Sequence, residues 1–147
     1  MPFGDRETDA AWLAALILGE GTIQLTHRFV SITISNSDVA IVEEAKRIIG
    51  HENCALKIYA DKRSKLWRPC YTLHVWGGYE IKIALLSWLF PYLVGRKREL
   101  AGFAIQLMES RLAKKARRGG RTPNGVRYDL FEQMLIESVN ALNRKGG

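Results

Sequence analysis

The spacing of hydrophobic positions changes repeatedly along the chain, and each change marks the end of one predicted element and the start of another. Apolar residues recur with helical spacing in some segments and alternate with polar residues in shorter ones. The expected helices span about residues 10–19, 38–49, 79–90, 96–116 and 128–143, and the expected strands span about 22–28, 29–35, 55–62 and 67–76. This order predicts an α+β fold with an αββαββα core and additional C-terminal helices.

The expected strands carry apolar side chains on one face and polar side chains on the other. Four antiparallel strands of this kind form a sheet whose apolar face packs on helices and whose polar face meets solvent. Glutamine can pair with adenine and arginine with guanine in the DNA major groove, so a polar sheet face suits base recognition. For each residue alone, an ordinary solvated strand face is the alternative. The candidate DNA-binding residues on this face are Gln24, Thr26, Arg28, Thr33, Lys57, Tyr59, Arg68, Thr72 and His74.

The first expected helix is apolar and ends on a single carboxylate, Glu20, between Gly19 and Gly21. Small residues at Ala11, Ala15 and Gly19 recur every four positions and therefore share one helix face. Such a face lets a second backbone approach closely, and Gly21 is expected to end the helix in a left-handed turn. We expect two copies of this helix to pack together, with a divalent cation offsetting the repulsion between their carboxylates. The alternative is a core helix with an exposed glutamate at a frayed end.

Residues 13–21, Leu-Ala-Ala-Leu-Ile-Leu-Gly-Glu-Gly, resemble the signature of the LAGLIDADG homing endonucleases. The chain departs from that signature at two positions, because Ala15 replaces a glycine and Leu18 replaces the first acidic residue. Members of this family bind metal through the final acidic position, so the resemblance implies that Glu20 is the catalytic metal ligand, with Gly19 at the same site. The signature occurs once, which in this family implies a homodimer formed through the small-residue face.

The resemblance also implies an activity. The expected protein is a sequence-specific DNA endonuclease that uses Mg²⁺, or Mn²⁺ or Ca²⁺ in its place, to cut both strands of a long pseudo-palindromic site. An intron is the expected origin. The expected partners are double-stranded DNA and a second copy of the chain, with no membrane involved. The main alternative is an RNA-splicing maturase or a DNA-binding regulator that uses the same scaffold without cleavage. An unrelated basic α+β domain is a third, less favoured interpretation.

Two further catalytic positions follow from the resemblance. The family often places a polar residue at the end of the second strand, which selects Asn36, although capping of the next helix explains this residue equally well. It also places a basic residue after a Pro-Tyr-Leu turn, found here at residues 91–93. Counting from the proline selects Arg96, a shift of one selects Lys97, and Arg98 is a third choice. A basic residue there would stabilise charge or position water.

The chain carries a formal net charge of +7 and has an isoelectric point near 9.6, within the range of nucleic-acid-binding domains. Its basic residues gather in three segments, 57–68, 96–98 and 111–121. Arg63, in the expected turn between the third and fourth strands, would contact bases or phosphates. The later basic loop is expected to contact phosphates, which set affinity rather than sequence preference. A loop that only faces solvent is the alternative. Its candidate residues are Arg117, Arg118 and Arg121.

Length and cysteine content complete the expectation. At 147 residues the chain is expected to form one domain, residues 1–147, that represents one half of the dimer. Cys54 and Cys70 do not form a disulfide framework, and no signal peptide or long apolar span is recognisable. The protein is therefore expected to be intracellular, in the cytoplasm or an organelle, rather than secreted.

Overall fold

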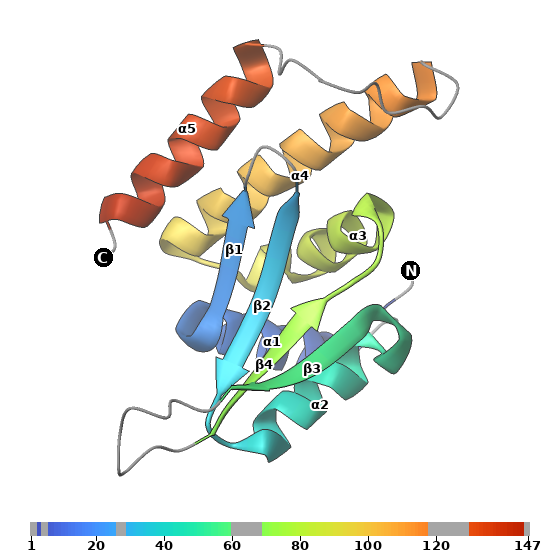
Figure 1. The fold of residues 1–147 in the computed structure, drawn as a ribbon, viewed down its shortest axis with the longest axis vertical. Coiled ribbons are helices and arrows are strands. Elements are labelled where there is room, and N and C mark those ends of the chain that lie inside the picture. The colour runs from blue at the N-terminus through green and yellow to red at the C-terminus, as the bar shows by residue number, and fades with distance from the viewer. Residues whose placement is uncertain (1–2, 4–5, 26–28, 60–68, 118–129, 146–147) are drawn as a thin grey trace.

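The computed structural model describes residues 3, 6–25, 29–59, 69–117 and 130–145, and within them the predicted order of elements is confirmed (Figure 1). The helices and strands are α1 (Glu7–Glu20), β1 (Gly21–Leu25), β2 (Val30–Asn36), α2 (Val39–Ile49), η1 (His51–Asn53), β3 (Cys54–Tyr59), β4 (Cys70–Val75), α3 (Tyr79–Leu89), η2 (Phe90–Tyr92), α4 (Gly95–Arg117) and α5 (Leu130–Lys145). The fold is α+β, with α4 and α5 following the αββαββα core.

The strands form an antiparallel sheet in the order β1-β2-β4-β3. Ile34 lies opposite Leu73 in the β2–β4 ladder, and both side chains are fully buried. Because side chains alternate along a strand, the neighbouring residues Thr33 and His74 pair on the other face. In Figure 1, α1 and α4 pass behind the sheet, so the polar face points toward the viewer. The predicted division into an apolar and a polar face is confirmed.

The core lies between the sheet and the helices. Leu13 and Ile17 of α1, Leu86 and Leu89 of α3, and Leu107 of α4 are all fully buried in one cluster with the apolar sheet face. Burying a side chain of this size stabilises the fold by roughly 1.5–3 kcal/mol. The position of α1 is therefore set by its packing against both the sheet and the neighbouring helices.

The helix α1 ends in a different backbone conformation from the one expected from the sequence. It ends in extended backbone, because Gly21 has φ −94° and ψ 155°, so the predicted left-handed turn is wrong. Glycine is needed there for space: a Cβ at Gly21 would lie 2.8 Å from Ile17 Cα and 2.9 Å from Ile17 O. Among the described residues, positive φ angles occur instead at Gly50, Gly77 and Gly95, and of these Gly50, with φ 106°, ends α2.

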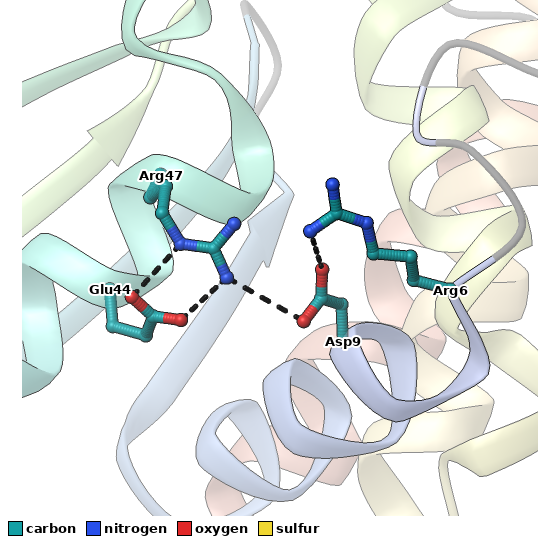
Figure 2. Close-up of polar contacts among 4 residues, drawn as sticks. All are labelled: Arg6, Asp9, Glu44 and Arg47. Atoms are coloured by element: carbon teal, nitrogen blue, oxygen red, sulfur yellow. Dashed lines mark hydrogen bonds and ion pairs between the residues drawn. The ribbon is translucent and has the colours of Figure 1, made fainter.

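Ion pairs connect the start of α1 to α2 (Figure 2). Arg47 lies 2.6 Å from Glu44 within α2 and 3.6 Å from Asp9 of α1, and Asp9 lies 3.5 Å from Arg6. Hydrogen bonding to Arg47 lowers the pKa of the Glu44 carboxyl. Exposed pairs of this kind each contribute little to stability. They link the two helices at the end of α1 that is remote from Glu20.

We expect Gly21→Ala to destabilise the protein by about 1–3 kcal/mol, because the new methyl group would press on the Ile17 backbone. Urea unfolding measures the change. The matched control is Gly102→Ala in α4, where the added Cβ would make an ordinary 3.7 Å contact with Phe90. That substitution should stabilise the protein by about 0.5–1 kcal/mol through helix propensity. Equal unfolding midpoints for the two variants would contradict the close-approach argument.

Candidate metal centre and DNA-binding face

The helix α1 is apolar on two opposite sides. One side packs in the core through Leu13 and Ile17, while Ala11, Ala15 and Gly19 are exposed on the other. A Cβ added at Gly19 would meet nothing within 4 Å, so the packing of this chain does not itself require a glycine there. Trp12, on the exposed side, is 38% accessible. A helix that is apolar all round is usually buried, so this face has the character of a contact surface.

Glu20 is the last residue of α1, and β1 begins directly after it. Its side chain is exposed. The C-terminus of a helix carries partial negative charge, which makes a carboxylate there unfavourable. The last turn of α1 contains no basic residue that could offset this charge. Compensation comes instead from a different element, α4.

Lys97 of α4 reaches the C-terminus of α1. Its Nζ donates hydrogen bonds to the carbonyl oxygens of Ile17 and Leu18, at 2.7 and 2.9 Å. Burial lowers the pKa of the Lys97 ammonium and Arg96 lowers it further, whereas the negative charge of Glu20 raises it. Lys97 therefore lies within electrostatic reach of Glu20 while its hydrogen bonds go to the backbone.

The other two basic residues of this segment have different partners. Arg96 Nη1 lies 3.5 Å from the carbonyl oxygen of Leu142 in α5, and the Arg98 guanidinium lies 4.7 Å from the centre of the Phe90 ring. Of the three candidates after the Pro-Tyr-Leu turn, the structure thus brings Lys97 to the signature helix. Counting residues from the proline had favoured Arg96.

Asn36 ends β2 at the same end of the β1–β2 ladder at which Glu20 precedes β1. Its Oδ1 accepts a hydrogen bond from the backbone N–H of Asp38 at 2.8 Å. Asp38 in turn caps α2 by accepting from the N–H of Ala40 at 3.0 Å. Asn36 thus supports the start of α2, as the structural alternative predicted, and its catalytic role stays a prediction.

The polar face of the sheet carries rows of side chains set by the strand register. Thr22, Thr33 and His74 form one row, and Ser35, Thr72 and Lys57 form the next. Gln24 and Lys57 are exposed, whereas Thr33 and His74 are half-buried.

Thr72 differs from its expected environment. It lies on the predicted face but is only 9% exposed, and a 2.9 Å hydrogen bond joins its Oγ1 to Ser35 Oγ. Its hydroxyl therefore links β2 to β4, and the expectation that it faces solvent is wrong.

One residue on this face was not recognised from the sequence. Trp76 directly follows β4 and is 53% exposed, and Lys57 Nζ lies 5.9 Å from the centre of its ring. The alternation Thr72, His74, Trp76 places it on the polar face and is the signal that could have identified it. An aromatic ring beside a lysine offers an apolar surface and a positive charge together.

Several candidate residues cannot be placed. Thr26, Arg28, Arg63, Arg68, Arg118 and Arg121 lie outside the described residues, as do the side chains of Tyr59 and Arg117.

The surroundings of His74 favour its neutral imidazole form. Its Nε2 is shielded from solvent and has no hydrogen-bond partner among the described residues. Burial lowers the pKa of His74 below its usual 6.5, and the charge of Lys57 lowers it further. A neutral histidine offers one donor and one acceptor, which suits a polar partner on this face.

The chemistry of Glu20 fits a hard divalent cation. Carboxylate and carbonyl oxygens are the ligands that Mg²⁺ and Ca²⁺ prefer. Across the part of the chain that the structure describes, no cluster of three or more His, Cys, Asp or Glu side chains could hold a metal. Burial raises the pKa of the Cys54 thiol to about 11, which disfavours a thiolate ligand. None of the described helices is both long and apolar enough to cross a membrane.

Comparison with known proteins identifies the family. Residues 7–86, from α1 into α3, match the family model described as the LAGLIDADG-like domain. This match covers more than half of the 147 residues, so the chain belongs to the family of LAGLIDADG-like domains. The predicted resemblance is confirmed. No curated protein matches the chain.

Two similar solved structures are those of the homing endonuclease I-CvuI. The first is its complex with its target (Sro1.3) in the presence of 2 mM Ca. It shares 19% sequence identity with this chain at a TM-score of 0.49, and the alignment covers 92% of this chain and 95% of the I-CvuI chain. The second is its complex with the I-CreI target in the presence of 2 mM Mg, in which the DNA is not cleaved. It shares 19% sequence identity with this chain at a TM-score of 0.48, and the alignment covers 93% of this chain and 96% of the I-CvuI chain.

The shielded His74 predicts a pH dependence of stability. Because the folded pKa is lowered, the folded protein binds fewer protons than the unfolded chain once the pH falls below 6.5. Stability is then lost as the pH drops from 6.5 through the lowered pKa. We expect His74→Gln to lose less stability than the wild type between about pH 7.5 and about pH 5.5, measured by urea unfolding. Identical pH profiles would show that His74 protonates as easily in the folded protein as in the unfolded chain.

Proposed function

We propose that this chain is one half of a homodimeric DNA endonuclease that uses a divalent cation to cut both strands of a long pseudo-palindromic site. Residues 1–147 form a single domain in this proposal. One observation carries it: Glu20 is exposed at the end of an apolar helix that continues without a linker into the polar-faced strand β1. A hydrolytic group and a recognition surface are thereby joined in one rigid unit.

The exposed face of α1 supports the dimer. Ala11, Ala15 and Gly19 present little side-chain volume, so the α1 helix of a second copy can approach closely. Trp12 would lose its solvent-exposed surface in that contact. The two Glu20 carboxylates would then lie near the axis relating the two copies.

Glu20 and the carbonyl oxygen of Gly19 are the proposed ligands for Mg²⁺, with Mn²⁺ or Ca²⁺ as substitutes. A bound divalent cation supplies an activated water, stabilises charge on the phosphate and assists the leaving oxygen. Asn36 is proposed to orient water at the end of β2. Arg96, which is exposed and always charged, is proposed to stabilise the phosphate. Lys97 holds the end of α1.

Recognition is proposed to use the polar face of the sheet. The exposed Gln24 and Lys57 suit base edges and phosphates, with Thr33 and His74 between them. Trp76 would add an apolar contact beside Lys57. The candidates outside the described residues, and Tyr59 and Arg117, are proposed to extend this surface. A net charge of +7 per chain favours strongly salt-dependent binding.

An intron origin is part of this proposal, and the test substrate follows from it: DNA that carries the exon junction at which the encoding intron inserts. A maturase or regulator would bind nucleic acid without cutting this junction. The presence of Glu20 at the last acidic position of the signature favours the nuclease.

We expect Glu20→Gln to lower the single-turnover cleavage rate at least about 100-fold, because a neutral amide is a poor ligand for a divalent cation. DNA affinity measured in Ca²⁺ should fall much less, since the sheet face is unchanged. Glu7→Gln, at the opposite end of α1, is the matched control and should cleave normally. Normal cleavage by Glu20→Gln would refute the catalytic assignment, and binding without cleavage by the wild type would favour the maturase or regulator.

We expect Ala15→Lys to convert the dimer into a monomer in sedimentation at micromolar concentration, because a long charged side chain would enter the contact between the two α1 helices. Ala113→Lys introduces the same side chain at an exposed position of α4 and should leave the dimer intact. A wild-type chain that sediments as a monomer would refute the paired-helix arrangement.

A further inference from the structure

The C-terminus of α1 concentrates negative charge. The helix dipole contributes partial negative charge there, Glu20 adds a full charge, and the last turn contains no basic residue. In the proposed dimer two such ends meet, so the two carboxylates repel each other before any metal binds. Charges brought together in partly desolvated surroundings interact more strongly than in water. The dimer therefore needs a positive charge that belongs to the protein.

Lys97 is placed to supply that charge. It belongs to α4, which lies far beyond Glu20 in the sequence. Its ammonium donates to the carbonyl oxygens of Ile17 and Leu18 at 2.7 and 2.9 Å, in the last turn of the helix. Carbonyls in the last turn of a helix commonly lack helical donors, and Ile17 O accepts the Lys97 bond in addition to the N–H of Gly21.

The orientation of these bonds matters. Both acceptors are backbone oxygens, and Lys97 interacts with Glu20 through charge, without a hydrogen bond to its carboxylate. A lysine that paired directly with Glu20 would compete with a metal for the carboxylate oxygens. A lysine anchored to the backbone two and three residues earlier offsets the charge and leaves those oxygens to the cation.

We propose that Lys97 is a positioning residue that anchors the C-terminal turn of α1 and acts as a built-in counter-charge to Glu20, so that the dimer assembles before metal binds. The inference rests on the proposed function, because it presumes that two Glu20 residues meet. It assigns Lys97 to the assembly of the metal centre, whereas the sequence had assigned it to the chemistry of the phosphate.

The test compares dimer dissociation constants in EDTA, measured by sedimentation or by the anisotropy of a labelled chain. Lys97→Met keeps the length of the side chain and removes its charge and donors, and should weaken the dimer about ten-fold. Lys97→Arg should restore most of the affinity. The matched control is Lys82→Met, since Lys82 is also half-buried and donates to a backbone carbonyl, that of Val30, at 2.8 Å. That control should leave the dissociation constant unchanged.

A second substitution separates counter-charge from simple structural damage. Adding Glu20→Gln to Lys97→Met should restore the dimer in EDTA, because the repelling carboxylates are gone. Ca²⁺ should strengthen the Lys97→Met dimer more than the wild-type dimer, because the cation replaces the missing charge. A structural defect would respond to neither change.

The outcomes distinguish this inference from the proposed function. A wild-type chain that never dimerises overturns both. A wild-type dimer that Lys97→Met weakens no more than Lys82→Met, or that Glu20→Gln does not restore, overturns the role of Lys97 alone. If Lys97→Met fails to fold, Lys97→Gln and Lys97→Gln/Glu20→Gln give the same comparison, because glutamine removes the charge but keeps an amide donor, and Glu20→Gln must then strengthen the dimer. No such gain would overturn the inference.

Discussion

The direct junction between α1 and β1 is the constraint on which the rest of the structure depends. Glu20 is the last residue of the helix and Gly21 is the first of the strand, so no linker separates the two elements. The backbone at Gly21 lies so close to Ile17 that no side chain fits between them. Because Ile17 is fully buried, core packing fixes both the carboxylate and the first strand of the polar sheet face. Neither can move without the other.

The signature helix also depends on a part of the chain beyond the matched family region. The match covers residues 7–86, yet Lys97, which holds the end of α1, comes from α4. The helix dipole and Glu20 create an electrostatic cost at that end, and the compensating charge arrives through the tertiary structure. The α4 helix is therefore more than a C-terminal addition to the core, since it contributes to the same local site.

Much of this arrangement could be predicted from the sequence, because periodicity is a local property. Alternation in β1 and β2 correctly separates Ile23 from Gln24, and the glycine at position 50 correctly ends α2. What failed depended on distant partners. Thr72 hydrogen-bonds to Ser35 across the sheet, and the need for Gly21 comes from its approach to Ile17, and neither contact is visible in local periodicity.

Counting from the proline could not show which basic residue of α4 contacts α1, for a related reason. Successive residues on a helix point about 100° apart, so a count from Pro91 that is wrong by one selects a different direction. Only the position of α4 in the folded protein decides that Lys97 and not Arg96 reaches the carbonyls of α1.

The hydrogen bond between Ser35 and Thr72 has a consequence for how such a protein could acquire a new target. These hydroxyls join β2 to β4 on the polar face, so replacing either one disturbs the pairing of the strands as well as the surface. Gln24 and Lys57 on the same face are exposed and can change with little effect on the fold. If this face reads DNA as proposed, changes in recognition should therefore begin at the edge strands of the sheet and spare its middle. The fold would persist while the preferred DNA sequence changes, because the paired strands β2 and β4 in the middle of the sheet stay the same.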